Sequence, residues 1–375
     1  MLKFAAFWKV QRAIARSAVS PGRKLLLSGL FGLMLAWGAV NALCLWLDRW
    51  LYPGFRKIEV REPIFIIAHP RSGTTLTHRL MLADPGRYSF ARAYELLLPA
   101  ITQKKLVRAL GWLDRKFLKE TLHDWVRSKE SSALGDLQDI HHFSFLEAEE
   151  DEWFYFMTFA SGVSLSLFPY VEEFRDVMTF DKMPPEMQRE HMDYYHGCLQ
   201  RQLYLDGPEK VFCSKNTTTF IPKIETLAAR YPDSRFLHIV RNPFEVAPSL
   251  LSLMASTWRQ MGFPEDDIRN GLAVIHATNM AAYEQAFRAL DALDPTRYHI
   301  LDYRDIASAP KATMTAVYAA LGVEMTPAYA QVLDALQEKA RSHVSGHDYG
   351  LEEFGLSEDA IRADAPTVFQ RYRFD

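Results

Sequence analysis

The chain has 375 residues, of which 49% are hydrophobic and 24% are charged, and its formal net charge is -3 at pH 7. This is enough apolar sequence for one large α/β domain with room for an insertion. The weak negative charge provides no global field that favours nucleic acid, so no nucleic-acid partner is expected. Three scattered cysteines exclude a disulfide framework, and no Cys/His cluster predicts a metal site.

Residues 1–24 form a basic segment that contains Lys and Arg but no acidic residue, with large apolar residues between the charges. This pattern predicts an amphipathic helix suited to a membrane surface, ended by Ser20-Pro21-Gly22. Residues 25–50 then contain an uncharged run from Leu25 to Leu47. About twenty residues at about 1.5 Å each cover a hydrocarbon core of about 30 Å, so a hydrophobic membrane helix is expected. A hydrophobic helix docked on the globular domain is the alternative.

The orientation of this segment is weakly specified. More Lys and Arg precede the run than follow it, which favours a cytoplasmic N-terminus. Arg49, Arg56, Lys57 and Arg61 follow closely, however, and reduce this bias. Glycines within the run would also permit a bent segment that enters the membrane without crossing it.

Residues 64–76 combine a short apolar run with a turn and the start of a helical pattern. Ile64 to Ala68 is rich in β-branched residues and predicts a buried strand, which ends at His69-Pro70. At a junction from strand to helix, unpaired backbone N–H groups and the helix dipole favour an anion. The residues expected to hold this anion are Arg71, Ser72, Gly73, Thr74 and Thr75.

This loop differs from the nucleoside-triphosphate motif G-x-x-x-x-G-K-[ST] in two places. Ala68 stands at the first glycine, and Thr74 stands where the motif has lysine. The cation is instead Arg71, so the loop can hold phosphate-like oxygens but lacks the lysine that contacts β- and γ-phosphates. An ordinary strand–turn–helix with an exposed arginine is the alternative.

The next stretch contains a candidate base and a candidate insertion. Glu95 lies between polar and apolar residues, where a carboxylate is either solvated or faces the anion site as a base. Residues 101–130 are basic, with Leu, Trp and Phe at helical spacing. We expect a helical, acceptor-side or membrane-facing insertion at about residues 100–205.

A second α/β unit follows the insertion. Its predicted elements are a strand at 210–214, an exit turn at Lys215-Asn216-Thr217, a helix at 220–231 and a buried strand at 236–240. The last strand ends in Arg241 instead of the Asp that holds Mg²⁺ in a Walker-B strand. Ser249 follows about two helical turns later, so the two side chains can grip one phosphate together. Two anion sites without a carboxylate for Mg²⁺ argue against a kinase or NTPase.

The C-terminal part is mostly helical. The elements predicted from its periodicity are helices at 266–292, 311–321 and 327–341, and a strand at 298–302 that is followed by Tyr303. A Gly- and His-rich loop that includes His343 comes next, and we expect it to fold over a ligand.

From about Ile64 to the C-terminus, these motifs resemble the sulfotransferase family, in particular the bacterial and tyrosylprotein-like branches that carry Pro-Arg-Ser-Gly-Thr-Thr. The resemblance implies an α/β fold for residues 51–375, a P-loop-like three-layer sandwich with a central parallel sheet. The N-terminal membrane-associated helices have no counterpart in soluble family members. The resemblance also implies 3′-phosphoadenosine 5′-phosphosulfate (PAPS) as co-substrate, without a metal.

The resemblance further implies roles for single residues. The loop from Arg71 to Thr75 is similar to the family's 5′-phosphosulfate loop. Arg241 and Ser249 match the 3′-phosphate pair, including its spacing. Tyr303 resembles a tyrosine near the adenine, and Glu95 falls where a related branch has its general base.

Two further matches are less complete. Lys215-Asn216 resembles a strand exit that carries a proline in the family, and this proline is absent here. His343 lies in the stretch that resembles the late loop over the cofactor.

The implied reaction is in-line transfer of a sulfuryl group from PAPS to an acceptor hydroxyl. Glu95 would take the proton, and Arg71 would stabilise the charge on the leaving oxygen. Membrane tethering suggests a lipophilic acceptor, such as a lipid or a sterol-like alcohol. If the source is bacterial, PAPS is made in the cytosol, so we expect a membrane-associated enzyme with a cytoplasmic catalytic domain. A P-loop-type kinase of a small molecule and a non-catalytic anion-binding membrane protein are the alternatives.

Overall fold

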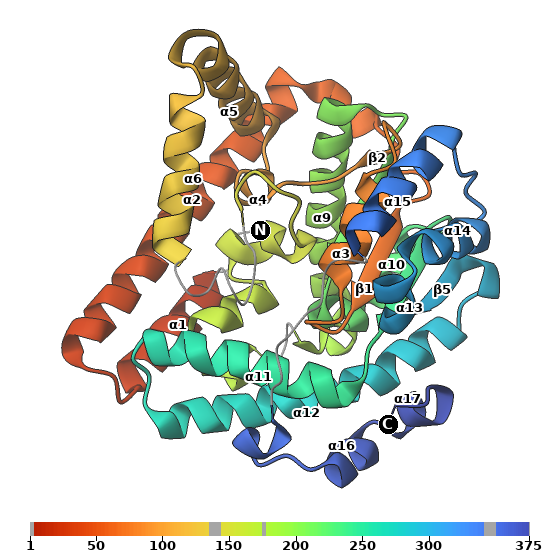
Figure 1. Cartoon of the computed structure of the whole chain (residues 1–375). Helices are drawn as coiled ribbons and strands as arrows, with labels where there is room; N and C mark the ends of the chain where they lie inside the picture. The colour runs from red at the N-terminus through yellow and green to blue at the C-terminus, as the bar shows by residue number, and fades with distance from the viewer. Residues whose placement is uncertain (1–3, 135–143, 175–177, 341–349, 375) are drawn as a thin grey trace. The chain divides into compact units, whose positions relative to one another are not determined.

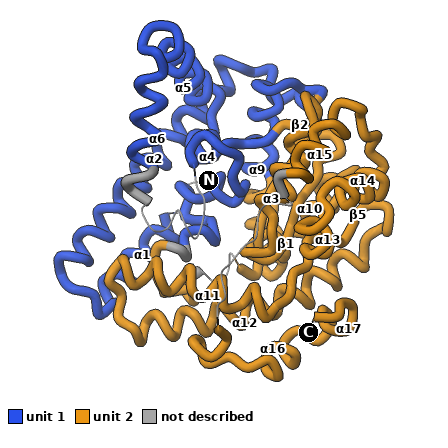
Figure 2. Tube along the Cα trace, in the orientation of Figure 1, with its two compact units in different colours: residues 1–59, 90–164, 193–209 blue, residues 60–89, 165–192, 210–375 orange. Residues whose placement is uncertain are grey.

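The chain forms two compact units, each assembled from separate stretches of sequence (Figure 2). The structure, a computed structural model, describes residues 4–134, 144–174, 178–340 and 350–374. Unit 1 comprises residues 1–59, 90–164 and 193–209, and unit 2 comprises residues 60–89, 165–192 and 210–375.

Unit 2 is built on a parallel sheet with strand order β2-β3-β1-β4-β5 (Figure 1). The strands are β1 (Ile64–Ala68), β2 (Tyr88–Ser89), β3 (Val211–Asn216), β4 (Arg235–Val240) and β5 (Tyr298–Asp302). The central strand β1 pairs in parallel with β3, where Ile64 lies opposite Cys213, and with β4, where Ile64 lies opposite Arg235. Every residue of β1 is buried, as expected for a parallel strand covered on both faces.

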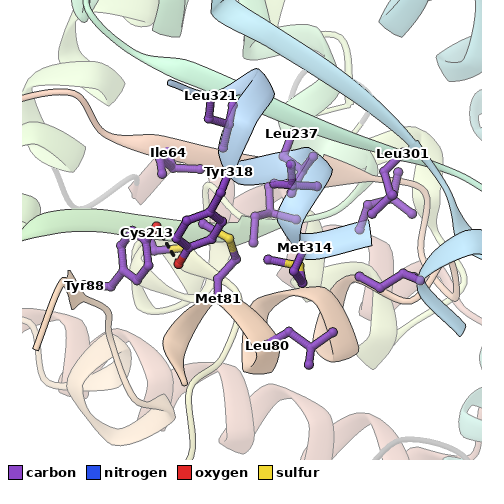
Figure 3. Close-up of a cluster of buried hydrophobic side chains, with 14 of the residues drawn as sticks. Ile64, Leu80, Met81, Tyr88, Cys213, Leu237, Leu301, Met314, Tyr318 and Leu321 are labelled. Atoms are coloured by element: carbon purple, nitrogen blue, oxygen red, sulfur yellow. Dashed lines mark hydrogen bonds between the residues drawn. The ribbon is translucent and has the colours of Figure 1, made fainter. Parts of the chain in front are cut away.

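One face of the sheet carries a large cluster of buried apolar side chains (Figure 3). The covering helices are α3 (Thr74–Leu82), α13 (Tyr303–Ser308), α14 (Pro310–Ala320) and α15 (Pro327–Ala340). Ile64 of β1 and Leu237 of β4 pack here with Met81 and Met314. Because side chains alternate along a strand, the residues between them point to the opposite face.

That opposite face is covered mainly by α10 (Ile224–Arg230), α11 (Pro243–Gln260) and α12 (Glu265–Asp291). Phe65 of β1 stacks on Phe236 of β4 with ring centroids 5.5 Å apart, and His238 meets the edge of Phe287 from α12. Helices on both faces of a central parallel sheet confirm the predicted three-layer α/β fold. The remaining elements of unit 2 are η5 (Val171–Phe174), η6 (Phe180–Lys182), η7 (Thr218–Lys223), η8 (Pro295–Arg297), η9 (Leu351–Phe354), α16 (Glu358–Asp364) and α17 (Pro366–Arg371).

Unit 1 is helical. Its elements are α1 (Phe4–Arg16), α2 (Pro21–Leu51), η1 (Pro53–Lys57), α4 (Ala93–Leu97), α5 (Ile101–Leu113), η2 (Asp114–Leu118), α6 (Thr121–Leu134) and η3 (Asp151–Thr158). Two further elements, η4 (Gly162–Leu167) and α9 (Pro185–Asp206), run from one unit into the other.

The apolar N-terminal segment is the helix α2. Ser20 does not close the first helix as predicted: α1 ends at Arg16, and the Ser20 side chain caps α2 by accepting from the backbone N–H of Arg23. Among the described residues, α2 is the helix long and apolar enough to cross a bilayer. A core helix or a signal sequence meets the same criterion, so this is weak support for membrane association.

A buried ion pair fixes the C-terminal end of α2 within unit 1. Asp48 lies 2.9 Å from Nε of Arg201, and both side chains are almost fully buried. The same carboxylate accepts from the backbone N–H groups of Ile101 and Thr102 at the start of α5. Asp48 therefore caps α5 and anchors α2 at once.

Two predicted boundaries in the second α/β unit are wrong. Lys215 and Asn216 lie inside β3 rather than in an exit turn, because the buried strand continues past Ser214. The helix predicted at 220–231 is divided into η7 and α10, and Pro222 lies inside η7, where proline removes a helical hydrogen bond. The helix α9 lies in the insertion that was expected to be helical, but it was not singled out as a separate helix from the sequence.

Candidate active site

The turn between β1 and α3 is a tight loop with two left-handed residues. Arg71 has φ 67° and Gly73 has φ 83°, and Gly73 directly precedes the first residue of α3. These conformations turn the chain sharply, so the unpaired N–H groups at the start of α3 border the loop. The loop therefore offers backbone donors and the Arg71 side chain to an anion.

Tyr303, the first residue after β5, covers this loop. A Cβ placed on Gly73 would lie 2.5 Å from the Tyr303 ring, so only glycine permits this close approach. The Arg241 guanidinium, directly after β4, lies 4.3 Å from the centre of the same ring, a cation–π distance. Because β1, β4 and β5 are neighbours, their carboxyl ends bring these side chains together. This edge of a parallel sheet is the usual ligand position in α/β folds.

Hydrogen bonds join the two predicted anion sites. Nε of Arg71 donates to Oγ of Ser249 on α11 at 3.0 Å. One terminal nitrogen of Arg241 donates to the backbone oxygen of Arg71 at 2.8 Å. The residues predicted to hold the 3′-phosphate and those predicted to hold the 5′-phosphosulfate are therefore direct neighbours in unit 2.

Arg241 also pairs with a carboxylate on the helix that follows it. Its Nε and its second terminal nitrogen donate to Glu245 at 2.9 and 2.6 Å. A phosphate bound to this face of the guanidinium would compete with the Glu245 carboxylate. Glu245 was not singled out in the sequence, although its position four residues after Arg241 is the spacing of a helical ion pair.

Three of the remaining residues predicted to hold the anion, Lys215, Ser72 and Thr74, are buried. Nζ of Lys215 lies 3.5 Å from Oγ1 of Thr75, at the long limit of a hydrogen bond. The Ser72 hydroxyl is fully buried and has no hydrogen-bond partner among the described residues, and Thr74 is also buried. The predicted residue His343 lies outside the described residues.

A buried histidine lies at the base of the loop and was missed by the sequence analysis. His69, the first residue after β1, stacks on Tyr283 with ring centroids 3.5 Å apart, and its Nδ1 lies 3.0 Å from Oδ1 of Asn279. Complete burial lowers the pKa of His69 to about 3, and the nearby His238 adds to this effect. His69 is therefore neutral at pH 7 and places an aromatic stack beneath the anion loop.

Glu95, the predicted base, belongs to unit 1, where it is completely buried in α4. Its carboxylate accepts from the Tyr94 hydroxyl, from Arg108 at 2.9 Å and from the Gln202 amide at 3.2 Å. Burial raises the pKa of Glu95, but the Lys104 charge and the Arg108 bond outweigh it, so the pKa lies below its usual value. Glu95 is thus ionised at neutral pH and firmly hydrogen-bonded.

A second carboxylate shares the arginine beside Glu95. The same terminal nitrogen of Arg108 lies 2.8 Å from Oδ1 of Asp206, and Gln202 also donates to Asp206 at 2.8 Å. Bonds to both carboxylates raise the pKa of Arg108 although burial opposes this. Glu95 and Asp206 therefore form one charge network with Arg108, and a variant of one carboxylate can be compared with a variant of the other.

Comparisons with known proteins agree with this geometry. A sequence profile described as the sulfotransferase family matches residues 63–327. The chain is 25% identical over 324 residues to the omega-hydroxy-beta-dihydromenaquinone-9 sulfotransferases Stf3 of Mycobacterium bovis and Mycobacterium tuberculosis. The aligned region covers 84% of this chain and 75% of each relative.

Solved structures share the fold. Sulfotransferase STF9 from Mycobacterium avium superimposes with a TM-score of 0.74 at 16% identity, covering 96% of this chain and 89% of that chain. Sulfotransferase STF1 from Mycobacterium tuberculosis gives a TM-score of 0.68 at 17% identity, covering 96% of this chain and 92% of that chain. The family profile spans most of the chain and includes the whole anion loop and Arg241. The chain therefore belongs to the sulfotransferase family and is a transferase enzyme.

Proposed function

We propose that this enzyme transfers a sulfuryl group from PAPS to a hydroxyl of a lipophilic acceptor. The observation that carries the proposal is the cluster of Arg71, Arg241, Ser249 and Tyr303 at the carboxyl ends of β1, β4 and β5. The Arg241 guanidinium beside the Tyr303 ring, the Arg71 guanidinium bonded to Ser249 and one helix N-terminus suit a nucleotide with phosphates on both sides of its ribose.

Each part of the cluster has a proposed role toward PAPS. Arg241 and Ser249 bind the 3′-phosphate, after Glu245 releases the guanidinium. Arg71, the loop N–H groups and Lys215 bind the 5′-phosphosulfate. The Tyr303 ring lies beside the adenosine. Charge-assisted hydrogen bonds of this kind contribute about 1.5–3 kcal/mol each.

The chemical step forms a bond between the acceptor oxygen and sulfur while the bond between sulfur and the 5′-phosphate oxygen breaks. The electron pair stays on the phosphate, where Arg71 stabilises the growing charge. Removing one such donor typically costs about 10²–10³-fold in rate. The acceptor proton moves to a base, for which we propose Glu95, and a positioned base typically contributes about 10²–10⁴-fold.

The acceptor is proposed from the curated relatives, whose name describes a hydroxylated dihydromenaquinone. A long isoprenoid alcohol of this kind is membrane-bound, which agrees with a helix as apolar as α2. We propose a membrane-associated enzyme with its catalytic domain on the cytoplasmic side, where a bacterial cell makes PAPS.

Mass spectrometry of lipid extracts tests this function directly. Purified enzyme with PAPS should add one SO₃ group to a hydroxylated lipid, and the Arg241→Ala enzyme should do so only at much higher PAPS concentration. A phosphate adduct formed from ATP and Mg²⁺ would show a kinase instead. Tight binding of the product nucleotide 3′-phosphoadenosine 5′-phosphate (PAP), without turnover of any lipid, would show a non-catalytic anion-binding protein.

A further inference from the structure

The helix α2 has an inward face that contacts other elements of unit 1. Its buried residues lie three, four or seven positions apart, as a single helix face requires: Leu27, Phe31, Met34, Gly38, Asn41 and Asp48. Phe31 packs near Phe159, with ring centroids 6.0 Å apart, and the Asn41 amide donates to the backbone oxygen of Leu97 at 2.9 Å. With the Asp48–Arg201 ion pair, these contacts hold α2 from its first third to its end.

The outward face of α2 is apolar and exposed. Its exposed large apolar side chains are Leu25, Leu26, Leu30, Leu33, Val40, Leu43, Trp46, Trp50 and Leu51. Trp37 lies at the border of this face, since its ring is partly exposed and its indole N–H donates to the backbone oxygen of Leu97 at 3.2 Å. No charged residue lies between Leu25 and Leu47. At about 1.5 Å per residue, this stripe is roughly 40 Å long. A continuous exposed apolar surface of this length indicates an interaction site rather than a solvated helix.

In the same unit, the chain turns from α5 through η2 into α6 (Figure 1). A second group of exposed apolar side chains lies around this turn. Its members are Leu106, Leu110, Trp112, Leu113, Phe117, Leu118, Leu122 and Trp125. The buried carboxylate of Asp114 fixes this turn by accepting from the backbone N–H groups of Leu122 and His123 at 2.9 and 3.0 Å. The turn is thus a defined structure that holds aromatic side chains toward solvent.

Basic residues accompany both apolar groups. The first acidic residue of the chain is Asp48, so α1 and the start of α2 carry only positive charge. Near the turn, Lys116 is exposed, and its Nζ lies 4.7 Å from the Trp112 ring centre and 5.3 Å from that of Phe117. Apolar side chains flanked by Lys and Arg match a leaflet of anionic lipid, which provides both hydrocarbon and negative charge.

The polar contacts of the inward face argue against α2 crossing the bilayer. A spanning α2 would carry its attached partners into hydrocarbon, including the buried Arg201 and Gln103, whose amide donates to Asn41 at 2.8 Å. Charged and amide groups at that depth are costly. We propose that unit 1 binds one face of an anionic membrane, with the outward face of α2 and the 112–122 turn immersed in one leaflet and α2 parallel to the membrane plane.

Vesicle flotation tests the surface. The full chain, transferred from detergent, should float with phosphatidylglycerol-containing vesicles and less with purely zwitterionic vesicles.

Two variants locate the binding surface. Leu33→Glu with Leu43→Glu should reduce flotation at least tenfold. Met187→Glu, which adds charge at an exposed apolar residue of unit 2, should leave it unchanged. Circular dichroism confirms that each variant folds. Failure of the wild type to bind vesicles, equal binding by the charged variant, or a lipid-free soluble oligomer that buries Leu33 would overturn the proposal.

Cysteine labelling separates a helix in the membrane plane from one that crosses the membrane. Gly22→Cys and Arg49→Cys place thiols at exposed positions near the two ends of α2, in a Cys44→Ser background. The buried Cys198 and Cys213 should contribute little labelling. In sealed cells and in inverted vesicles, a membrane-impermeant maleimide should label both sites from the same side. Labelling from opposite sides would overturn the in-plane arrangement. Neither assay uses turnover, so neither depends on the proposed reaction.

Discussion

At the residue scale, the anion loop depends on a glycine that cannot be replaced. Gly73 combines a left-handed φ of 83° with a close approach of the Tyr303 ring, which occupies the space that a Cβ would need. Gly86 has a similar φ of 76°, but a Cβ added there would meet no atom within 4 Å. The pair therefore separates backbone strain from the loss of the contact between loop and ring.

We predict that Gly73→Ala weakens PAP binding more than tenfold, because the new methyl group must displace Tyr303. Gly86→Ala should only lower stability, by about 1–2 kcal/mol, since a left-handed alanine is strained. Calorimetric titration with PAP and thermal unfolding measure the two effects. Equal PAP affinity in the two variants would show that the close approach at Gly73 does not shape the nucleotide site.

The proposed role of Glu95 as the general base can be tested with a single variant. If Glu95 is the base, Glu95→Gln lowers kcat by about 10²–10⁴-fold and leaves the KM for PAPS nearly unchanged. Asp206→Asn is the matched control, because it removes the other carboxylate bound to the same nitrogen of Arg108. A similar fall in kcat in both variants would assign Glu95 to positioning Arg108 instead of to proton transfer.

Single residues differ in how far the sequence reveals them. Arg71, Arg241 and Tyr303 follow predicted strands closely, so a parallel sheet brings them to one edge whatever the details of packing. The partnership of His69 with Asn279 spans 210 residues, and no local pattern marks it. Contacts between distant helices depend on packing angles that the sequence pattern does not define.

At the element scale, buried strands were easier to predict than polar helices. The strands at 64–68 and 298–302 were predicted to the residue. For β1 the reason is that a strand covered on both faces is a short continuous apolar run. The edge strand β5 is only partly buried. The helix α9, within the insertion expected to be helical, was not singled out, since its polar and aromatic residues give a weak apolar stripe. The predicted length of α2 was nearly right, but composition alone did not show which of its residues are buried against the rest of unit 1.

The attachment of α2 gives a prediction for stability. Asp48→Asn leaves Arg201 buried without its partner charge and weakens the cap on α5, so we expect a loss of about 3–5 kcal/mol. Arg49→Ala, at the exposed next position, should change stability by less than about 0.5 kcal/mol. Urea unfolding in detergent measures both. A small effect of Asp48→Asn would mean that the end of α2 does not depend on this ion pair.

At the scale of the whole molecule, two buried histidines predict the pH dependence of folding. Burial lowers the pKa of His69 to about 3 and that of His238 to about 4. The unfolded chain takes up protons at these residues below about pH 6.5, whereas the folded protein does not. The unfolded state therefore binds more protons, and the free energy of unfolding falls as pH is lowered from about 6.5 toward 4.

Urea unfolding at several pH values checks this expectation. The backbone oxygen of Ile67 lies 2.9 Å from Nδ1 of His238, and the amide in His238→Asn keeps a donor for it. This variant should reduce the slope of the free energy of unfolding against pH by an amount equivalent to up to one bound proton. An unaltered slope in His238→Asn would contradict burial of a neutral imidazole in β4.

In the proposed complex one nucleotide bridges Arg71 and Arg241, and calorimetric titration with PAP and with adenosine 5′-phosphate tests this bridging most directly. We predict that the wild type binds PAP about 10- to 150-fold more tightly than adenosine 5′-phosphate, since the bonds to the 3′-phosphate add about 1.5–3 kcal/mol of binding free energy. Arg241→Ala should remove this difference, and Arg71→Ala should weaken both ligands. Equal binding of the two nucleotides by the wild type, or a preference for PAP that survives in Arg241→Ala, would contradict the account.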